Sequence, residues 1–134
     1  MGIGSVIVLD THAWVWWSTK PGKLGKKARR AIDKAERIGI PAIAVWEVAM
    51  KAHLGKLRFD RPFPAWIEEA LATDTRIELL PLLPRISIDA VQLSWKHSDP
   101  ADRFIVATAR AHDAALATAD ERIRESGLVR CVWD

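Results

Sequence analysis

Short apolar runs alternate with amphipathic stretches along most of this chain. Residues 6–9, Val-Ile-Val-Leu, form a β-branched run with no polar alternation, as expected for a central parallel strand that is covered on both faces. Comparable runs predict further strands at residues 39–43, 77–80, 115–118 and 130–133. Because amphipathic stretches separate these runs, the pattern predicts an α/β fold with a mainly parallel sheet.

The intervening stretches have the spacing and the end signals of helices. The clearest helix start is Asp99-Pro100, since Asp is a good N-cap and Pro suits the first helical position. The pattern predicts helices at residues 11–18, 25–36, 45–54, 64–72 and 100–111, a helix that Ser87 caps and that ends near Lys96, and a helical segment after Asp120.

Four acidic residues fall where such a fold gathers side chains at one edge of its sheet. Asp10 follows the first strand and Asp120 follows residues 115–118, while Glu47 and Asp102 lie near the starts of predicted helices. Ligands of open α/β sheets bind beyond the carboxyl ends of the strands. Carboxylates crowded there repel one another by roughly 4 kcal/mol per pair at about 4 Å, so they need cations or raised pKa values. Hard oxygen ligands favour Mg²⁺ or Mn²⁺ over zinc, so we expect one or two such ions.

Each of these acids also has an ordinary structural role. Asp10 and Asp120 could cap the helices that follow them. Glu47 could pair with Lys51, four residues further along a helix. A charge at the mouth of a buried strand is costly without a partner, which favours the metal site over capping alone.

Neighbouring polar residues are candidates for a supporting role. The hydroxyls of Thr11 and Thr118 could orient a carboxylate or bond only to the local backbone. Asp99 competes with Asp102 for the site and is the better helix cap. Arg103 could neutralise a phosphate or pair with a nearby acid such as Asp99.

Composition limits the size and the location of the protein. With 134 residues and 49% hydrophobic content, the chain is expected to form one domain over residues 1–134. Its single cysteine, Cys131, cannot form an intramolecular disulfide. No apolar run approaches the roughly 20 residues of a membrane-spanning helix. These features predict a cytoplasmic protein without membrane contact.

Charged and aromatic residues near the first strand allow two interpretations. The net charge of +3 is mild, but basic residues gather between positions 20 and 37. They could form a solvated helix face or a surface that contacts nucleic acid beside Asp10. Trp14, Trp16 and Trp17 more often fill a core or an interface than stack on bases.

Three segments, in this order, resemble the VapC family of PIN-domain proteins: LDTHAWVWW, VWEVAMKAHLGKL and HSDPADRFIVATARAHDAALATAD. Each alone is a weak signal, but their order, spacing and strand-helix context agree from Val6 to about Trp133. The resemblance implies a PIN-like three-layer α/β/α fold with a central, mainly parallel sheet of about five strands. The family motif has its acidic ligand immediately before an arginine, which favours Asp102 over Asp99.

The resemblance also implies an activity. It points to a metal-dependent endoribonuclease, the toxin of a toxin-antitoxin pair, which hydrolyses RNA phosphodiester bonds with metal-activated water. The expected partners are RNA, a cognate antitoxin and a second copy of the chain in a homodimer, and the expected cofactor is Mg²⁺ or Mn²⁺. The implied catalytic and metal-binding residues are Asp10, Glu47, Asp102 and Asp120, with Thr11, Asp99, Arg103 and Thr118 in support.

Two other classes of function compete with this interpretation. A non-catalytic PIN-like protein or RNA-binding module would keep the site without cutting, although the full acidic set argues against it. A haloacid-dehalogenase-like phosphatase would use Asp10 as a nucleophile. Those enzymes need a second aspartate two residues on, where this chain has His12.

Overall fold

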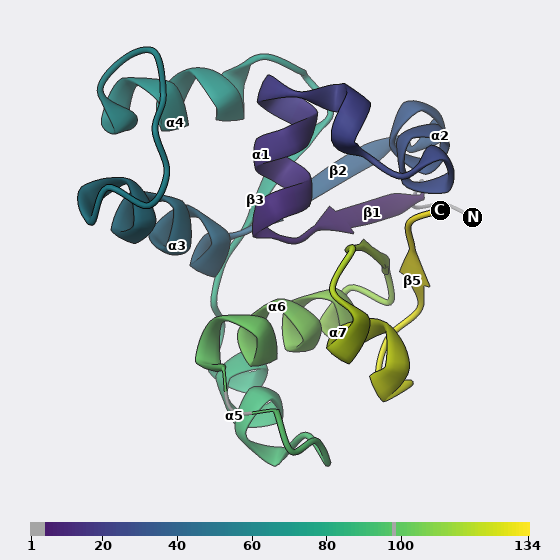
Figure 1. Ribbon diagram of the computed structural model, residues 1–134. Coiled ribbons are helices and arrows are strands. Elements are labelled where there is room, and N and C mark those ends of the chain that lie inside the picture. Colours follow the sequence, from purple (N-terminus) through teal and green to yellow (C-terminus); the bar gives the residue numbers. More distant parts are fainter. Residues whose placement is uncertain (1–4, 98) are drawn as a thin grey trace.

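The computed structural model describes residues 5–97 and 99–134 and is organised around one parallel sheet (Figure 1). Residues 1–4 of the expected domain and Ser98 of the HSDPADRF motif lie outside the described residues. Every strand pair is parallel, and β1 is central. The sheet has five strands in the order β3-β2-β1-β4-β5: β1 (Val6–Leu9), β2 (Arg37–Pro41), β3 (Ile77–Leu80), β4 (Ala115–Ala117) and β5 (Cys131–Val132).

Helices connect all of these strands. In the described part of the chain they are α1 (Thr11–Thr19), the short 3₁₀ helix η1 (Pro21–Lys23), α2 (Lys26–Lys34), α3 (Ala42–His53), α4 (Phe63–Ala72), α5 (Pro84–Gln92), α6 (Pro100–Ala111) and α7 (Glu121–Ser126). The chain winds outward from β1 to β3 and then returns to β4 on the other side of β1. The carboxyl ends of β1 and β4 therefore flank the switch point at which such sheets bind ligands.

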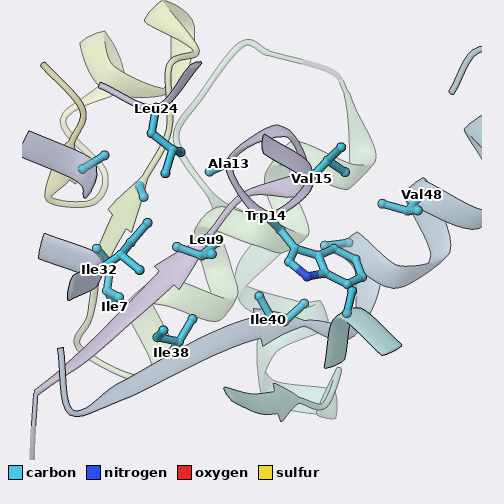
Figure 2. Packing of buried hydrophobic residues seen from close by; sticks show 14 of the residues in the cluster. Ile7, Leu9, Ala13, Trp14, Val15, Leu24, Ile32, Ile38, Ile40 and Val48 are labelled. Atoms are coloured by element: carbon cyan, nitrogen blue, oxygen red, sulfur yellow. The ribbon is translucent and has the colours of Figure 1, made fainter. Parts of the chain in front are cut away.

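Two hydrophobic layers cover the sheet. Because side chains alternate along a strand, Ile7 and Leu9 of β1 face one layer, whereas Val8 faces the other. The first layer contains side chains of α1 to α4, and Figure 2 shows Trp14 of α1 near Ile40 and Val48. Side chains of α6 and α7 fill the second layer, and α5 packs on α6. This arrangement confirms the expected three-layer α/β/α fold with a parallel sheet.

The predicted strands at 6–9 and 77–80 and the helix at 100–111 are confirmed, and the other predicted elements are present with boundaries that differ by one to four residues. Residues 42 and 43 of the predicted second strand belong to α3, because Pro41 ends β2 and acts as the N-cap of that helix. Ser87 is not a cap: it lies inside α5, which starts at Pro84 and ends at Gln92 rather than near Lys96. The fixed φ of proline suits a first helical turn, and this outweighed the capping tendency of serine.

No helix in the described part of the chain is both long and apolar enough to cross a membrane.

Candidate active site

A cavity of about 390 Å³ opens at the carboxyl edge of the sheet, and all four predicted acids line it. Asp10 directly follows β1, and Asp120 lies shortly after β4. Glu47 comes from α3, which follows β2, and Asp102 comes from the first turn of α6. Asp10 and Glu47 are almost fully buried, with 7% and 8% of their surface exposed. The fold thus brings acids from four separate segments to one cavity, as the strand-end argument predicted.

Asp10 is both a helix cap and a buried acid. Its Oδ1 accepts a hydrogen bond from the Ala13 N–H at 2.8 Å, which caps α1. Burial raises the pKa of Asp10 to about 6; the Thr118 hydroxyl and the Ala13 N–H oppose this rise, and the charges of Asp102 and Asp120 add to it. No ion pair within the described residues offsets this charge. A bound cation would relieve that cost.

Glu47 is held by two neighbours. The Thr11 hydroxyl donates a hydrogen bond to Oε1, and the Lys51 ammonium lies 3.4 Å from Oε2. The ion pair weighed as an alternative for Glu47 is therefore present, and Thr11 supports this acid rather than Asp10. Both oxygens already have a partner, so Glu47 has a fixed orientation at the cavity wall.

Asp102 and Asp99 have different positions at the start of α6. Asp99 is the N-cap, and its Oδ1 accepts from the Ala101 N–H at 2.9 Å. Asp102 Oδ2 lies 2.7 Å from Nε2 of His97. Partial burial raises the pKa of Asp102, the contact with His97 opposes this, and the charge of Asp99 adds to it.

His97, Asp99 and Asp102 form a close group of potential metal ligands, with one nitrogen and two oxygen atoms within 4.8 Å of one another. Among the described residues it is the only group of three with this spacing. No three of the four predicted acids are that close to one another. The contact of His97 with Asp102 is not among the features that the sequence predicted.

Asp120 is both a helix cap and the partner of a neighbouring cation. It caps α7 by accepting from the Arg122 N–H at 2.9 Å, and the Arg122 guanidinium lies 3.4 Å from its Oδ2. Burial raises the pKa of Asp120, but the hydrogen bonds from the Arg122 side chain and backbone outweigh this, so the pKa is lowered. The Thr118 hydroxyl accepts the Asp120 N–H at 3.0 Å, so Thr118 links the strand end to both acids.

Arg103 points away from the phosphate role considered for it. All five of its N–H groups donate to backbone carbonyls, at 2.8 to 3.2 Å. These carbonyls belong to Ala90, Val91, Leu93, Trp95 and His97, that is, to the end of α5 and the segment that leads to His97. The alternative pairing with an acid such as Asp99 is not formed, because no N–H group of Arg103 is left to donate. Arg103 instead holds the segment that presents His97 to Asp102.

Other side chains complete the cavity wall. Trp16, His12, Lys51 and Arg122 line it, and the His12 and Trp16 rings lie 5.6 Å apart. His12 and Trp16 are four residues apart on α1, and side chains with this spacing share one face of a helix. This spacing was the sequence signal that could have placed both side chains at the cavity. Trp14, by contrast, is a core residue with none of its surface exposed.

The cavity has a clear excess of negative charge. Its lining includes five carboxylates and two basic side chains, Lys51 and Arg122, each already paired with one of those acids. The oxygen-rich lining suits a hard divalent cation better than a soft one.

Comparisons with known proteins agree with this fold. The PIN domain family model matches residues 7–127. Ribonuclease VapC22 of Mycobacterium tuberculosis is 35% identical over 121 residues, which cover 90% of this chain and 91% of the relative. Among solved structures, the promoter-DNA-bound VapBC2 of Rickettsia felis aligns with a TM-score of 0.70 at 16% identity, over 96% of this chain and 99% of its own. The DNA-bound VapBC of Salmonella typhimurium gives the same TM-score and identity, over 96% of this chain and 97% of its own. On the extent of the PIN match and its likeness to ribonuclease VapC22, the chain belongs to the PIN-domain family, within its VapC branch.

Proposed function

We propose that this chain is a metal-dependent endoribonuclease and the toxin of a toxin-antitoxin pair. The observation that carries the proposal is the buried acidic cavity at the switch point of the sheet, in a chain that is 35% identical to ribonuclease VapC22. RNA as the substrate rests on that relative. The cavity lined by carboxylates supports metal-dependent hydrolysis of a phosphodiester bond as the type of chemistry.

The residues present fit a divalent cation. Asp10 is 7% exposed and burial raises its pKa to about 6, so the hydrogen bonds that it accepts do not fully offset the cost of burying its charge. The charges of Asp102 and Asp120 both raise the pKa of Asp10, and Glu47 lines the same cavity. These four would hold one or two Mg²⁺ or Mn²⁺ ions. When bound, such an ion lowers the pKa of water and offsets negative charge on a phosphate.

The protein's own groups orient the acids for this task. The α1 cap fixes Asp10 Oδ1, the Thr11 hydroxyl and Lys51 fix Glu47, and His97 holds Asp102 Oδ2. Preorganised carboxylates need little rearrangement when substrate and cation arrive. Lys51 and Arg122 lie among the acids, and each can exchange its ion pair with a carboxylate for one with the phosphate of a bound substrate.

The proposed partners follow from the VapBC complexes. Both are VapBC assemblies bound to DNA, in the Rickettsia felis case to a fragment from their promoter. By this likeness, we expect a cognate antitoxin and a homodimer for this chain. Binding of the antitoxin over the acidic cavity would be the simplest way to inhibit cutting.

The test is to incubate the purified, antitoxin-free protein with end-labelled cellular RNA in Mg²⁺, Mn²⁺ or EDTA. We expect cleavage with Mg²⁺ or Mn²⁺, no cleavage in EDTA, and products with 5′-phosphate and 3′-hydroxyl ends. The Asp102→Asn variant should lose at least about 100-fold in rate, the scale of removing one electrostatic group from a catalytic site.

Asp33→Asn is the matched control, because Asp33 is an exposed acid of α2 outside the cavity. It should cut at the rate of the unaltered protein. A folded protein that cuts no RNA in either metal would contradict the proposal and favour a binding module. Cleavage that persists undiminished in Asp102→Asn would move the chemistry away from this cavity.

A further inference from the structure

A second groove adjoins the acidic cavity and shares one side chain with it. This basic groove, of about 530 Å³, lies between the end of α1 with η1 and the segment at residues 57–61 that precedes α4. Trp16 lines both the acidic cavity and the basic groove. A ligand that extends out of the acidic cavity past Trp16 therefore enters the basic groove.

The floor of the basic groove is aromatic. Trp16 and Phe59 are half-buried in its lining, and the Phe59 ring stacks on Trp66 with centroids 4.1 Å apart. The Lys23 ammonium lies 5.8 Å from the centroid of a Trp16 ring. Proteins that bind single-stranded nucleic acids combine aromatic faces with cations, because every base has a face that can stack on an aromatic ring.

The rim of the basic groove carries uncompensated positive charge. Lys20, Lys23 and Arg58 are exposed, and none of them forms an ion pair within residues 5–97 and 99–134. The lining has one acid, Asp60, and it is already paired with Arg61. The sign of the charge thus changes at Trp16, from the acidic cavity to the basic groove.

We propose that the basic groove binds the single-stranded RNA next to the phosphate that is cut. Lys20, Lys23 and Arg58 contact the RNA backbone, and one or two bases lie on the Trp16–Phe59 floor. Single strands fit this floor because their bases are free to leave the stack, whereas bases in a duplex are not. The inference rests on the proposed ribonuclease function, since it names where the substrate of that same site lies.

The test measures RNA binding by fluorescence anisotropy, with a labelled oligouridine of about twelve nucleotides, a length within the range of single-strand sites. All proteins carry Asp102→Asn, so that the RNA stays intact. Changing Lys20, Lys23 and Arg58 together to Glu should weaken binding at least about 10-fold. Loss of three backbone contacts should also reduce the slope of log affinity against log salt by about 2.

The matched control changes Lys27, Arg30 and Lys34 to Glu on the exposed face of α2, which has the same charge change outside the basic groove. It should bind within about threefold of the parent protein. Phe59→Leu tests the floor separately, because leucine keeps the apolar contact but cannot stack; we expect a loss of several-fold. Thermal melting verifies that each variant is folded.

Equal weakening in the groove variant and the α2 variant would overturn the inference, since it would indicate general electrostatic attraction. Unchanged RNA affinity in the groove variant together with loss of antitoxin binding would also overturn it and make the groove a protein site. If the parent protein neither binds nor cuts RNA, it is the proposed function that fails. If the unaltered active site cuts RNA but the groove changes leave KM unchanged, the groove inference alone fails.

Discussion

At the scale of single residues, the charge of Asp10 lowers the stability of the fold, whereas the proposed metal site needs that charge. Its burial at the end of β1 raises its pKa from 3.8 to about 6. Between pH 3.8 and about 6, Asp10 is therefore protonated in more of the folded protein than of the unfolded chain. The contribution of Asp10 to stability is full below pH 3.8 and is lost as the pH rises through about 6. At pH 8 the charged residue costs about 3 kcal/mol, since one pKa unit is about 1.4 kcal/mol.

Replacing Asp10 with Asn should therefore stabilise the metal-free protein at pH 8. Asparagine keeps an oxygen for the Ala13 N–H but has no charge, so we expect a gain of about 1 to 3 kcal/mol in urea unfolding with EDTA. Added Mg²⁺ should stabilise the unaltered protein and not the variant. A variant that is less stable than the unaltered protein in EDTA would contradict this account, and Asp33→Asn should change neither quantity.

Protons should compete with the metal at the same residue. Below pH 6 the binding of one cation requires release of the proton from Asp10, so affinity should fall by about tenfold per pH unit. Calorimetric titration with Mn²⁺ between pH 5 and 8 measures this directly. An affinity that stays constant from pH 5 to 7 would mean that Asp10 is not a ligand.

At the scale of elements, Arg103 joins α5 to α6. Three of its five hydrogen bonds satisfy carbonyls at the end of α5, where a positive charge also interacts well with the helix dipole. The same guanidinium holds the carbonyls of Trp95 and His97. Through this segment, the junction of the two helices sets where His97 meets Asp102.

Arg103→Lys should break this junction while keeping the charge. Lysine cannot reach five carbonyls in a plane, so we expect a loss of about 2 to 3 kcal/mol in unfolding free energy. The Mn²⁺ affinity should also fall, because Asp102 loses its support. Arg85→Lys, on the exposed surface of α5, is the control and should change neither measurement. Unaltered stability of Arg103→Lys would contradict the structural role assigned to this residue.

Elements also mark the limit of what the sequence predicts. Asp10 and Asp120 were predictable, because an apolar strand followed by an acid places that acid at the edge of a parallel sheet. The end of β2 was not, since the run Gly-Ile-Pro-Ala-Ile is apolar throughout and has neither a strand period nor a helix period. The contact of His97 with Asp102 depends on the path of an irregular segment, which carbonyls bound by Arg103 determine, so no local pattern could reveal it.

At the scale of the whole molecule, the segment after β5 packs against the start of α2 near the site. The N-cap of α2, Gly25, lies against the backbone of Trp133, and the Ala28 N–H donates to the Trp133 carbonyl at 2.7 Å. The Trp133 ring lies 5.8 Å from that of Trp16, which lines the cavity. The contact between the segment after β5 and the start of α2 thus supports Trp16 in one wall of the candidate active site.

Gly25→Ala should disrupt the contact between α2 and Trp133. An added Cβ would lie 2.2 Å from the Trp133 carbonyl oxygen, so the backbone after β5 would have to move. We expect a loss of about 1 to 3 kcal/mol, the usual cost of overpacking, measured by urea unfolding. Gly22→Ala is the matched control, since its Cβ would meet no atom within 4 Å, and it should be neutral or slightly stabilising. Equal stability of the two variants would show that this close approach is not needed.

The central claim is that the switch point of the sheet holds a divalent cation on Asp10, Glu47, Asp102 and Asp120. The most direct measurement is a crystal structure of the protein with Mn²⁺, located by anomalous scattering. We expect one or two anomalous peaks within about 2.5 Å of carboxylate oxygens in the cavity, always including those of Asp10 and Asp102. Full occupancy of Mn²⁺ at any other place, with none in this cavity, would contradict this claim.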